Sequence, residues 1–335
     1  MLMRVTSPDM GISNMETSDA SRVVAPASSP NSRPLDSLPL VTLNDVLWLL
    51  YLYPIRLLAA VVPRWLLYLL GKLSDPIVQF ESRRAKARAA LWIARACRTS
   101  PENARRIAGQ SLSNTMFRTL DGLLLLRPSF DKMLRCTGIH GIQHLDSAIA
   151  RGKGVILLSG HFCANRIALR YLAAQGYPAL SVHGAAPSNK AAGQLGRQFL
   201  QPRSTQLQKR ALPDQVLIHD PDCSLKILRR LRAGGLVLLQ IDARAKNGTE
   251  QVFLGVPRPL RTGVCEIVRL SDCAVVPILH VGRSNGFRIR FDPMLEIFRA
   301  PSREAFVSAN LPRFVSVVER QVLENPGEWR LWNNQ

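Results

Sequence analysis

The second half of the chain alternates between short, continuously apolar runs and stretches of helical periodicity. Apolar runs without polar interruptions are typical of strands that are buried on both faces of a sheet. They occur at residues 154–160, 177–183, 236–242 and 274–281, and the helical stretches between them lie at 167–175, 224–235 and 262–273. Residues 286–297 alternate between apolar and polar and predict an edge strand of a hairpin. Repeated strand–helix–strand units predict an α/β fold with a central, mostly parallel sheet and helices on both of its faces.

The most hydrophobic stretch of the chain, residues 41–72, precedes this region. A helix that spans a bilayer needs roughly 20 mostly apolar residues, but Pro54, Arg56, Pro63 and Arg64 interrupt the run. Proline breaks helical hydrogen bonding, and arginine is costly at the middle of a bilayer. We therefore predict two short membrane-interacting helices that lie in the interface, with a single span or a pair of buried core helices as alternatives.

The other segments complete a three-part organisation. Residues 1–40 are rich in Ser, Pro, Asn and Asp without apolar periodicity, so we expect a disordered leader and no secretory signal. Residues 81–127 are expected to be helical and basic, with Ser100 as an N-terminal cap and Pro101 at the first helical position. The expected domains are therefore the leader (1–40), the membrane-associated helices (41–72) and the α/β domain (73–335).

The charge of the chain predicts an anionic partner, and its cysteines predict a reducing compartment. The formal net charge is +20, which favours binding to nucleic acid, an anionic membrane or an acidic protein or substrate. Aromatic residues make up only 6%, and none is interleaved with a basic stretch as a single-strand nucleic-acid groove requires, so nucleic acid is disfavoured. No Cys-x-x-Cys pair occurs among the six cysteines, which excludes a disulfide framework and a regular zinc site: Cys97, Cys136, Cys163, Cys223, Cys265 and Cys273.

His161 is the first candidate for chemistry because it follows the apolar run 154–160 directly. Ligands of open α/β sheets bind at the carboxyl ends of strands, and a histidine there is suited to remove a proton from an acceptor hydroxyl. We expect the backbone amides of residues 162–166, at the start of the next helix, to face a developing oxyanion. A structural, hydrogen-bonded histidine is the alternative. A nucleophilic Cys163 beside His161 is another, although a cysteine at a small-residue position is more often packing.

Two blocks of sequence resemble the bacterial lipid A late acyltransferases, the lauroyl and myristoyl transferases of the lysophospholipid-acyltransferase-like superfamily. The blocks read GIHGIQHLDSAIARGKGVILLSGHFCANRIAL and LVLLQIDARAKNGTEQVFLGVPRPLRTGVCEIVRLSDCAVVPI. They are similar to the family's strand ending in Gly-His-Phe, its Asp-containing loop, its Phe-x-Gly turn and its Thr-Gly helix start. The resemblance covers roughly residues 45–335 and implies an acyltransferase in which His161 is the general base.

The chain departs from the family pattern at the catalytic acid. The family has a glutamate five residues after the histidine, where this sequence has Arg166. The family also shows two aspartates in the second block, where this sequence has Gln240 and then Asp242. An acid must orient the imidazole and stabilise its protonated form. We name Asp242 as the best replacement, with a loop or capping residue as its alternative role, and Asp220 and Asp222 as weaker candidates.

The same resemblance implies residues that bind the substrate. An arginine near the active site is expected in the basic loop 184–213, and Arg197 or Arg203 matches it. Asn165 and Arg166 occupy the turn after the histidine, and Thr262 begins the Thr-Gly helix. A metal site is not expected, because His219, Asp220, Asp222 and Cys223 are adjacent in one turn, which is poor ligand geometry.

The function that the resemblance implies is transfer of a fatty acyl chain from an acyl carrier protein thioester to a hydroxyl of a phosphorylated glycolipid or related lipid. The expected partners are the acidic carrier protein, the anionic lipid acceptor and the membrane, with no bound cofactor and no nucleic acid. The expected location is the cytoplasmic face of the bacterial inner membrane. The alternative is an acyltransferase-fold protein that lost its chemistry with the glutamate and binds a lipid or a partner.

Overall fold

The structure is a computed structural model that describes residues 37–125, 127, 134–135, 137–183, 192–212, 214–218, 220–283 and 286–334. Leu40–Gln335 form one compact unit, distinct from Met1–Pro39. The predicted leader therefore lies almost entirely outside the described residues, and its disorder stays a prediction.

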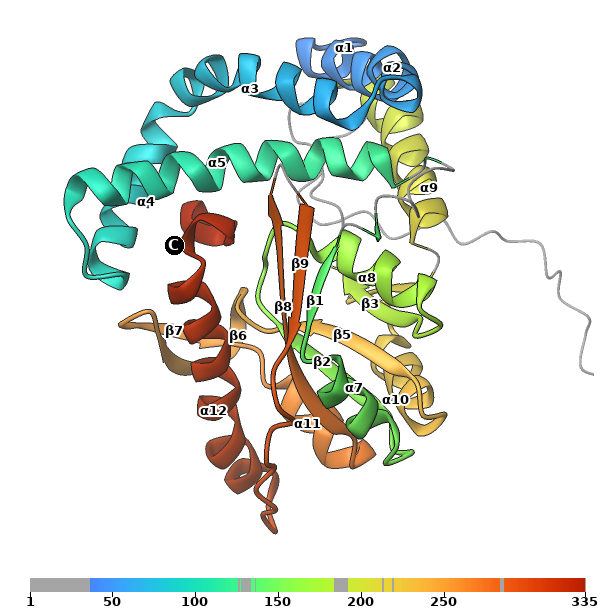
Figure 1. Ribbon diagram of the computed structural model, residues 1–335, viewed down its shortest axis with the longest axis vertical. Coiled ribbons are helices and arrows are strands. Elements are labelled where there is room, and N and C mark those ends of the chain that lie inside the picture. Colours follow the sequence, from blue (N-terminus) through green and yellow to red (C-terminus); the bar gives the residue numbers. More distant parts are fainter. Residues whose placement is uncertain are drawn as a thin grey trace, which may run out of the picture. The chain divides into compact units, whose positions relative to one another are not determined.

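A sheet of seven strands forms the centre of the described fold, in the order β1-β9-β8-β2-β5-β3-β4 (Figure 1). Strands β8, β2, β5, β3 and β4 run parallel to one another, whereas β9 is antiparallel to β8 and parallel to β1. This confirms the mostly parallel α/β sheet. The strands are β1 (Gly138–His140), β2 (Val155–Ser159), β3 (Ala179–His183), β4 (Gln215–Leu217), β5 (Leu236–Gln240), β8 (Ala274–Arg283) and β9 (Gly286–Phe291).

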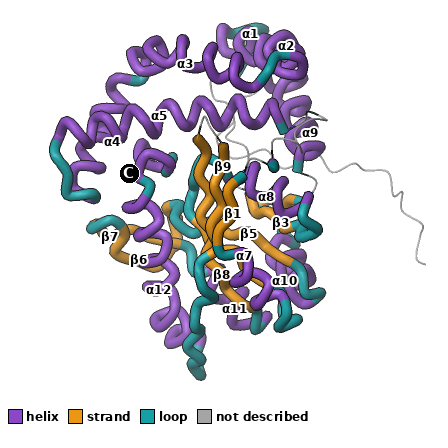
Figure 2. The backbone as a smooth tube through the Cα atoms, in the orientation of Figure 1, coloured by secondary structure: helices purple, strands orange, loops and turns teal. Residues whose placement is uncertain are grey.

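The predicted hairpin strand is confirmed over residues 286–291, where β9 pairs antiparallel with β8, but its placement at the edge and its extension to residue 297 are wrong. Strand β9 ends at Phe291 and lies between β8 and β1, so it is not at the edge. Residues 292–302 have no regular secondary structure (Figure 2). The edge strand β1 consists of three residues, Gly138–His140, which is too short to produce a visible periodicity in the sequence.

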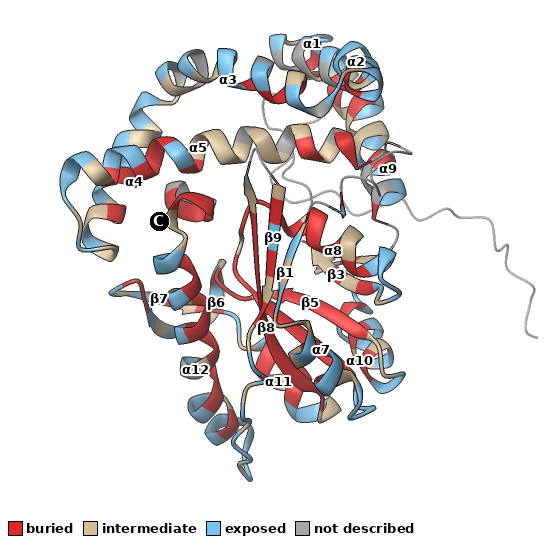
Figure 3. Cartoon of the chain, viewed as in Figure 1, coloured by how far each residue is buried: buried red, intermediate tan, exposed pale blue. Residues whose placement is uncertain are grey.

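Helices cover both faces of the sheet, and the strands that lie in the middle are buried along most of their length (Figure 3). In β2, Ile156 and Leu158 pack with the helices of one face, whereas Val155 and Leu157 pack with those of the other. Alternate burial on two faces explains why such strands appear as continuous apolar runs. The first face carries α4 (Arg83–Ala96), α5 (Pro101–Leu124), α10 (Cys223–Arg232), α11 (Gly263–Ser271) and α12 (Arg303–Glu324); the second carries α7 (Ile142–Ile149) and α8 (Asn165–Ala174).

A hairpin of β6 (Arg244–Phe253) and β7 (Val256–Leu260) lies between the strand predicted at 236–242 and the helix predicted at 262–273, where no strand was predicted. Its strands are joined at Leu254 and Gly255, both of which have positive φ angles, as a tight hairpin turn requires. Most of β6 is polar and exposed, and its pairing shifts register between Arg244 and Thr249. These features disrupt the alternation of apolar and polar residues along β6, which explains why the strand could not be predicted from the sequence.

The N-terminal apolar stretch forms two helical segments. The first comprises α1 (Leu43–Leu50), a π-helical turn η2 (Tyr51–Ile55) and α2 (Arg56–Val61), and the second is α3 (Arg64–Glu81). The chain breaks at Val62, which is extended as expected for a residue before proline. Pro54 does not break the first segment, because the π-helical turn accommodates it.

Helix α3 packs on α5 through Leu67, Tyr68 and Leu124. Among the described helices, none combines the length and the apolar character needed to cross a membrane. Other apolar side chains of these helices are exposed, including Leu57, Val61, Trp65 and Leu73. The association of this region with a membrane stays a prediction.

Two further expectations concern helices. The cap at Ser100 is confirmed, since its Oγ accepts a hydrogen bond from the amide of Asn103 at 3.3 Å and Pro101 begins α5. The basic loop expected at 184–213 is wrong for residues 196–211, which form the π-helical turn η3 (Gly196–Leu200) and α9 (Gln201–Ala211). Helix formation is explained by Leu200 and Leu207, which pack against the N-terminal helices beside Leu52.

Candidate active site

The register of two neighbouring strands brings the predicted histidine and aspartate together. Ser159 of β2 pairs with Gln240 of β5, so His161 and Asp242 each follow their strand by the same two residues. Gly160 permits the close approach, because a Cβ there would lie 2.9 Å from Val318 Cγ1 and 3.1 Å from Asp242 Oδ2. The two candidates therefore meet at the carboxyl end of the parallel sheet, where such folds bind their ligands.

The His161 ring and the Asp242 carboxylate are in direct contact. Nδ1 of His161 lies 2.5 Å from Oδ1 of Asp242, and the amide of His161 donates to Oδ2 at 2.8 Å. The Asp242 side chain is fully buried, whereas that of His161 is 17% exposed. Because Asp242 engages Nδ1, the other ring nitrogen, Nε2, is available to exchange a proton with a substrate.

Protein groups keep Asp242 ionised despite its burial. Burial acts to raise the pKa of the Asp242 carboxyl, but the charge of His161 and the hydrogen bonds from His161 and Trp329 outweigh it, so the pKa lies below its ordinary value. The indole Nε1 of Trp329 donates to Oδ2 at 2.5 Å. The buried Arg258 donates from Nη1 to the backbone carbonyl of Asp242 at 3.4 Å. The sequence reasoning missed both residues.

Guanidinium groups give the surroundings of His161 a positive charge. The amide of Arg330 donates to the carbonyl of His161 at 3.2 Å. Burial and the charge of Arg118 lower the pKa of the Arg330 guanidinium to about 10, and Arg166 acts in the same direction. Burial and the charges of Arg166, Arg330 and His161 lower the pKa of His183 to about 4, so His183 is neutral at pH 7. Three arginines thus act on the same site. Arg166 was predicted from the sequence, whereas Arg118 and Arg330 were not.

The backbone amides expected to form an oxyanion hole are largely occupied. The amide of Phe162 donates to the carbonyl of Gly160 at 2.9 Å, and that of Cys163 to the carbonyl of Glu328 at 3.1 Å. The amide of Arg166 donates to Oδ1 of Asn165 at 2.9 Å. The expectation that these three amides face an oxyanion is therefore wrong, because each of them already donates a hydrogen bond to a protein acceptor.

Cys163 has the environment of a packing residue. It is buried, and this burial, assisted by the Glu328 carboxylate, raises the pKa of its thiol to about 12. A thiolate is the nucleophilic form of cysteine. The alternative of a nucleophilic Cys163 is therefore disfavoured.

The remaining predicted substrate-binding residues lie elsewhere in the fold. Asn165 is buried at the start of α8, where its Oδ1 accepts a hydrogen bond from the amide of Arg166. Arg197 lies in η3, and Arg203 lies in α9 with Nη1 donating to Gln206 at 3.2 Å. Thr262 precedes α11, and its carbonyl accepts from the amides of the first turn. No contact with His161 is established for these residues, and their substrate-binding roles stay predictions.

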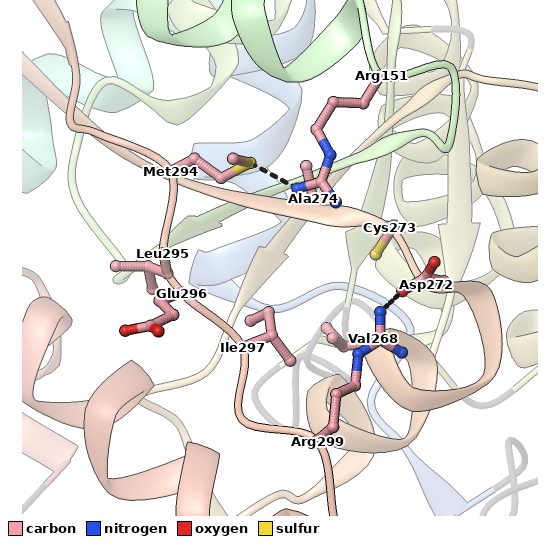
Figure 4. A pocket seen from close by; sticks show the side chains of 10 residues that line it. All are labelled: Arg151, Val268, Asp272, Cys273, Ala274, Met294, Leu295, Glu296, Ile297 and Arg299. Carbon is pink, nitrogen blue, oxygen red and sulfur yellow. Dashed lines mark hydrogen bonds and ion pairs between the residues drawn. The ribbon is translucent and has the colours of Figure 1, made fainter.

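Figure 4 shows the side chains that line a pocket, whose volume is about 320 Å³. The pocket lies at the opposite end of the sheet from His161. It adjoins Ala274, which begins β8 and pairs with Val155 at the amino end of β2. Asp272 forms an ion pair with Arg299 at its rim. None of the predicted site residues lines this pocket.

Within the part of the chain that is described, no group of three or more His, Cys, Asp or Glu side chains could hold a metal ion, and His219 lies outside that part.

Comparison with known proteins gives a family match over nearly the whole chain. The sequence model of a family described as bacterial lipid A biosynthesis acyltransferase matches residues 39–335. A search of curated proteins found no significant match. The matched range includes the N-terminal helices, the sheet and the C-terminal segment that contacts Asp242.

Proposed function

Since this chain belongs to the bacterial lipid A biosynthesis acyltransferase family, we propose that it transfers a fatty acyl chain from an acyl carrier protein thioester to a hydroxyl of a phosphorylated glycolipid or related lipid. The family membership supports the acyltransferase role. The contact between His161 and Asp242 is the single observation that carries the proposal, because it supplies a base and its acid although position 166 is an arginine.

His161 is the general base of the proposed reaction. Its Nε2 removes the proton of the acceptor hydroxyl while the oxygen attacks the thioester carbonyl and forms a tetrahedral oxyanion. The C–S bond then breaks, and the carrier's thiolate takes the proton back from the imidazolium. Asp242 holds the ring in the orientation that presents Nε2 and stabilises the positive charge that the ring carries between the two proton transfers.

Guanidinium groups complete the proposed site. With the amides of Phe162 and Cys163 occupied, stabilisation of the oxyanion falls to positive charge near His161. Arg330 is suited to this role for two reasons. Its buried Nε has no hydrogen-bond partner among the described residues, and its backbone amide donates a hydrogen bond to the carbonyl of His161. Arg166 is proposed to contact a phosphate of the acceptor, with Arg197, Arg203, Asn165 and Thr262 as the further predicted contacts.

The proposed location is the cytoplasmic face of the bacterial inner membrane. Exposed apolar side chains on α1 to α3 support attachment to a lipid surface. The net charge of +20 suits both an anionic membrane and an acidic carrier protein. The alternative of a degenerate, lipid-binding relative rests on the absent glutamate, and the position of Asp242 weakens it.

The test measures acyl transfer by purified protein in detergent. Acyl carrier protein loaded with a radiolabelled acyl chain is mixed with bacterial lipid extract, and labelled lipid is counted. The wild type is expected to transfer label, and His161→Ala to reduce turnover by at least about 100-fold, the low end for loss of a general base. Cys163→Ala is the matched control on the same turn and is expected to retain activity.

Two results would contradict the proposal. Wild-type protein that transfers no label to any lipid fraction, although folded, would favour the binding protein. A larger loss in Cys163→Ala than in His161→Ala would replace the general base with a cysteine nucleophile.

A further inference from the structure

The C-terminal segment of the chain is attached to the turn that carries His161. Phe162 forms an antiparallel β-bridge with Trp329. On either side of it, the amide of Cys163 donates to the carbonyl of Glu328 at 3.1 Å, and the amide of Arg330 donates to the carbonyl of His161 at 3.2 Å. Residues 328–330 are therefore paired through their backbone with residues 161–163, although the two segments are far apart in the sequence.

Helix α5 holds this segment from the other side. Ser111 Oγ donates to the carbonyl of Trp329 at 2.7 Å, and Asn114 Nδ2 donates to the carbonyl of Gly327 at 2.9 Å. Gly327 lies so close to α5 that a Cβ there would be 2.6 Å from Cδ of Gln110. The backbone of Trp329 is thus fixed between α5 and the turn after β2.

The indole of Trp329 is equally constrained. It is completely buried and packs against Phe253 and Trp332, with ring centroids 5.8 and 4.7 Å away. Its Nε1 reaches the carboxylate of Asp242 at 2.5 Å. A buried indole N–H pointed at a carboxylate oxygen is a stronger contact than a neutral pair, because the acceptor is charged.

We propose that Trp329 is a positioning residue of the catalytic pair, whose N–H holds Oδ2 of Asp242 so that Oδ1 stays on Nδ1 of His161. The inference rests on the proposed function. Oδ2 accepts from the indole and from the amide of His161, and Oδ1 accepts from the ring. Rotation of the carboxylate would therefore break three hydrogen bonds at once. Without the indole N–H, Oδ2 keeps one donor, and the carboxylate is held less firmly against the ring.

Removing the N–H also changes the proton affinity of the pair. A hydrogen bond to a carboxylate stabilises its ionised form, so its loss leaves more negative charge facing the imidazole. The His161–Asp242 pair then takes up a proton at higher pH. Acyl transfer requires an unprotonated His161 ring. As the pH is lowered, kcat is therefore expected to start falling at a higher pH in the variant than in the wild type.

The experiment compares Trp329→Phe with Trp332→Phe in the full-length protein. Both changes remove the N–H of a buried tryptophan in the same segment, but Nε1 of Trp332 donates to the carbonyl of Pro326 at 2.8 Å and not to Asp242. Two quantities are measured: kcat for acyl transfer as a function of pH, and the titration of the His161 ring by NMR of labelled histidine, assigned with His161→Ala.

Trp329→Phe is expected to lower kcat about 10-fold with little change in KM, the size expected for one hydrogen bond to a charged group. In Trp329→Phe, the fall of kcat at acidic pH and the titration of the His161 ring both move to higher pH. In Trp332→Phe, both stay at the wild-type pH. If Trp329→Phe does not fold, 3-benzothienylalanine at position 329 keeps the bicyclic shape and replaces the N–H with sulfur.

The outcomes separate this inference from the proposed function. Equal behaviour of the two phenylalanine variants, or an unchanged ring titration in Trp329→Phe, would overturn the positioning role. An inactive wild type would count against the proposed function alone, because the ring titration still decides whether Trp329 controls the pair.

Discussion

At the scale of residues, the proposed site is built around Asp242, which follows β5, whereas His161 follows β2. Asp242 occupies Nδ1 of His161 and is ionised in a fully buried position. Arg166 therefore does not stand in for the missing glutamate. It lies near His183 and Arg330, whose pKa values its charge lowers, and we infer that its position serves an anion of the acceptor.

A glutamate at position 166, which the resemblance would place there, is predicted to lower acyl transfer. In Arg166→Glu, a second carboxylate enters a site that already has its acid, and the cation proposed to bind the acceptor is lost. We expect kcat/KM for the lipid acceptor to fall on the order of 100-fold, the scale for a broken charge pair. Acyl transfer is measured for wild type, Arg166→Glu and the neutral control Arg166→Gln, which should show a smaller loss. A gain of activity in Arg166→Glu would support a degenerate site instead.

His161 and Asp242 were predictable from the sequence, but the other residues that contact Asp242 were not. His161 and Asp242 were identifiable because both follow apolar strands, and parallel strands end at the same edge. Trp329 contacts Asp242 across 87 positions of sequence, and no local pattern signals such a contact. Arg118 was likewise hidden, since it lies in the middle of the long helix α5.

At the scale of elements, burial decided what the sequence revealed. Strands β2, β5 and β8 were predicted because they are buried on both faces and contain almost only apolar residues. The hairpin β6–β7 was missed because its first strand is mostly polar. Helix α9 was missed for a similar reason, since few of its residues are apolar and its packing relies on Leu200 of the preceding turn and Leu207.

One face of α3 provides a test of membrane attachment. Trp65, Leu69 and Leu73 are spaced four residues apart and are 68%, 43% and 68% exposed, whereas Leu67 and Tyr68 are buried. Replacing all three exposed residues with serine should leave the fold intact and reduce binding to anionic phospholipid vesicles by at least about 100-fold, because each apolar side chain contributes roughly 1.5–3 kcal/mol on burial.

The vesicle measurement is made at high salt, which screens simple electrostatic adhesion. The matched control replaces Leu91, Leu270 and Leu323 with serine, exposed leucines on α4, α11 and α12. Retained binding in the α3 variant, or an equal loss in the control, would remove α3 from the proposed attachment surface.

At the scale of the whole molecule, three distant parts of the chain converge on one end of the sheet. The turn after β2 supplies His161, the turn after β5 supplies Asp242, and the C-terminal segment beside α5 supplies Trp329. The sequence predicted this α/β architecture because its strand–helix alternation is regular. It did not predict how the C-terminal segment returns to the site, since that depends on packing between elements far apart in the sequence.

We infer that Asp242 serves as the acid of the catalytic pair. The most direct test is the kcat of acyl transfer from acyl carrier protein to lipid for Asp242→Asn beside the wild type, with thermal unfolding recorded for both. In Asp242→Asn we expect kcat to fall at least about 100-fold in a folded protein, because an amide neither fixes the ring as a carboxylate does nor stabilises its charge. A folded Asp242→Asn variant with wild-type kcat would contradict it.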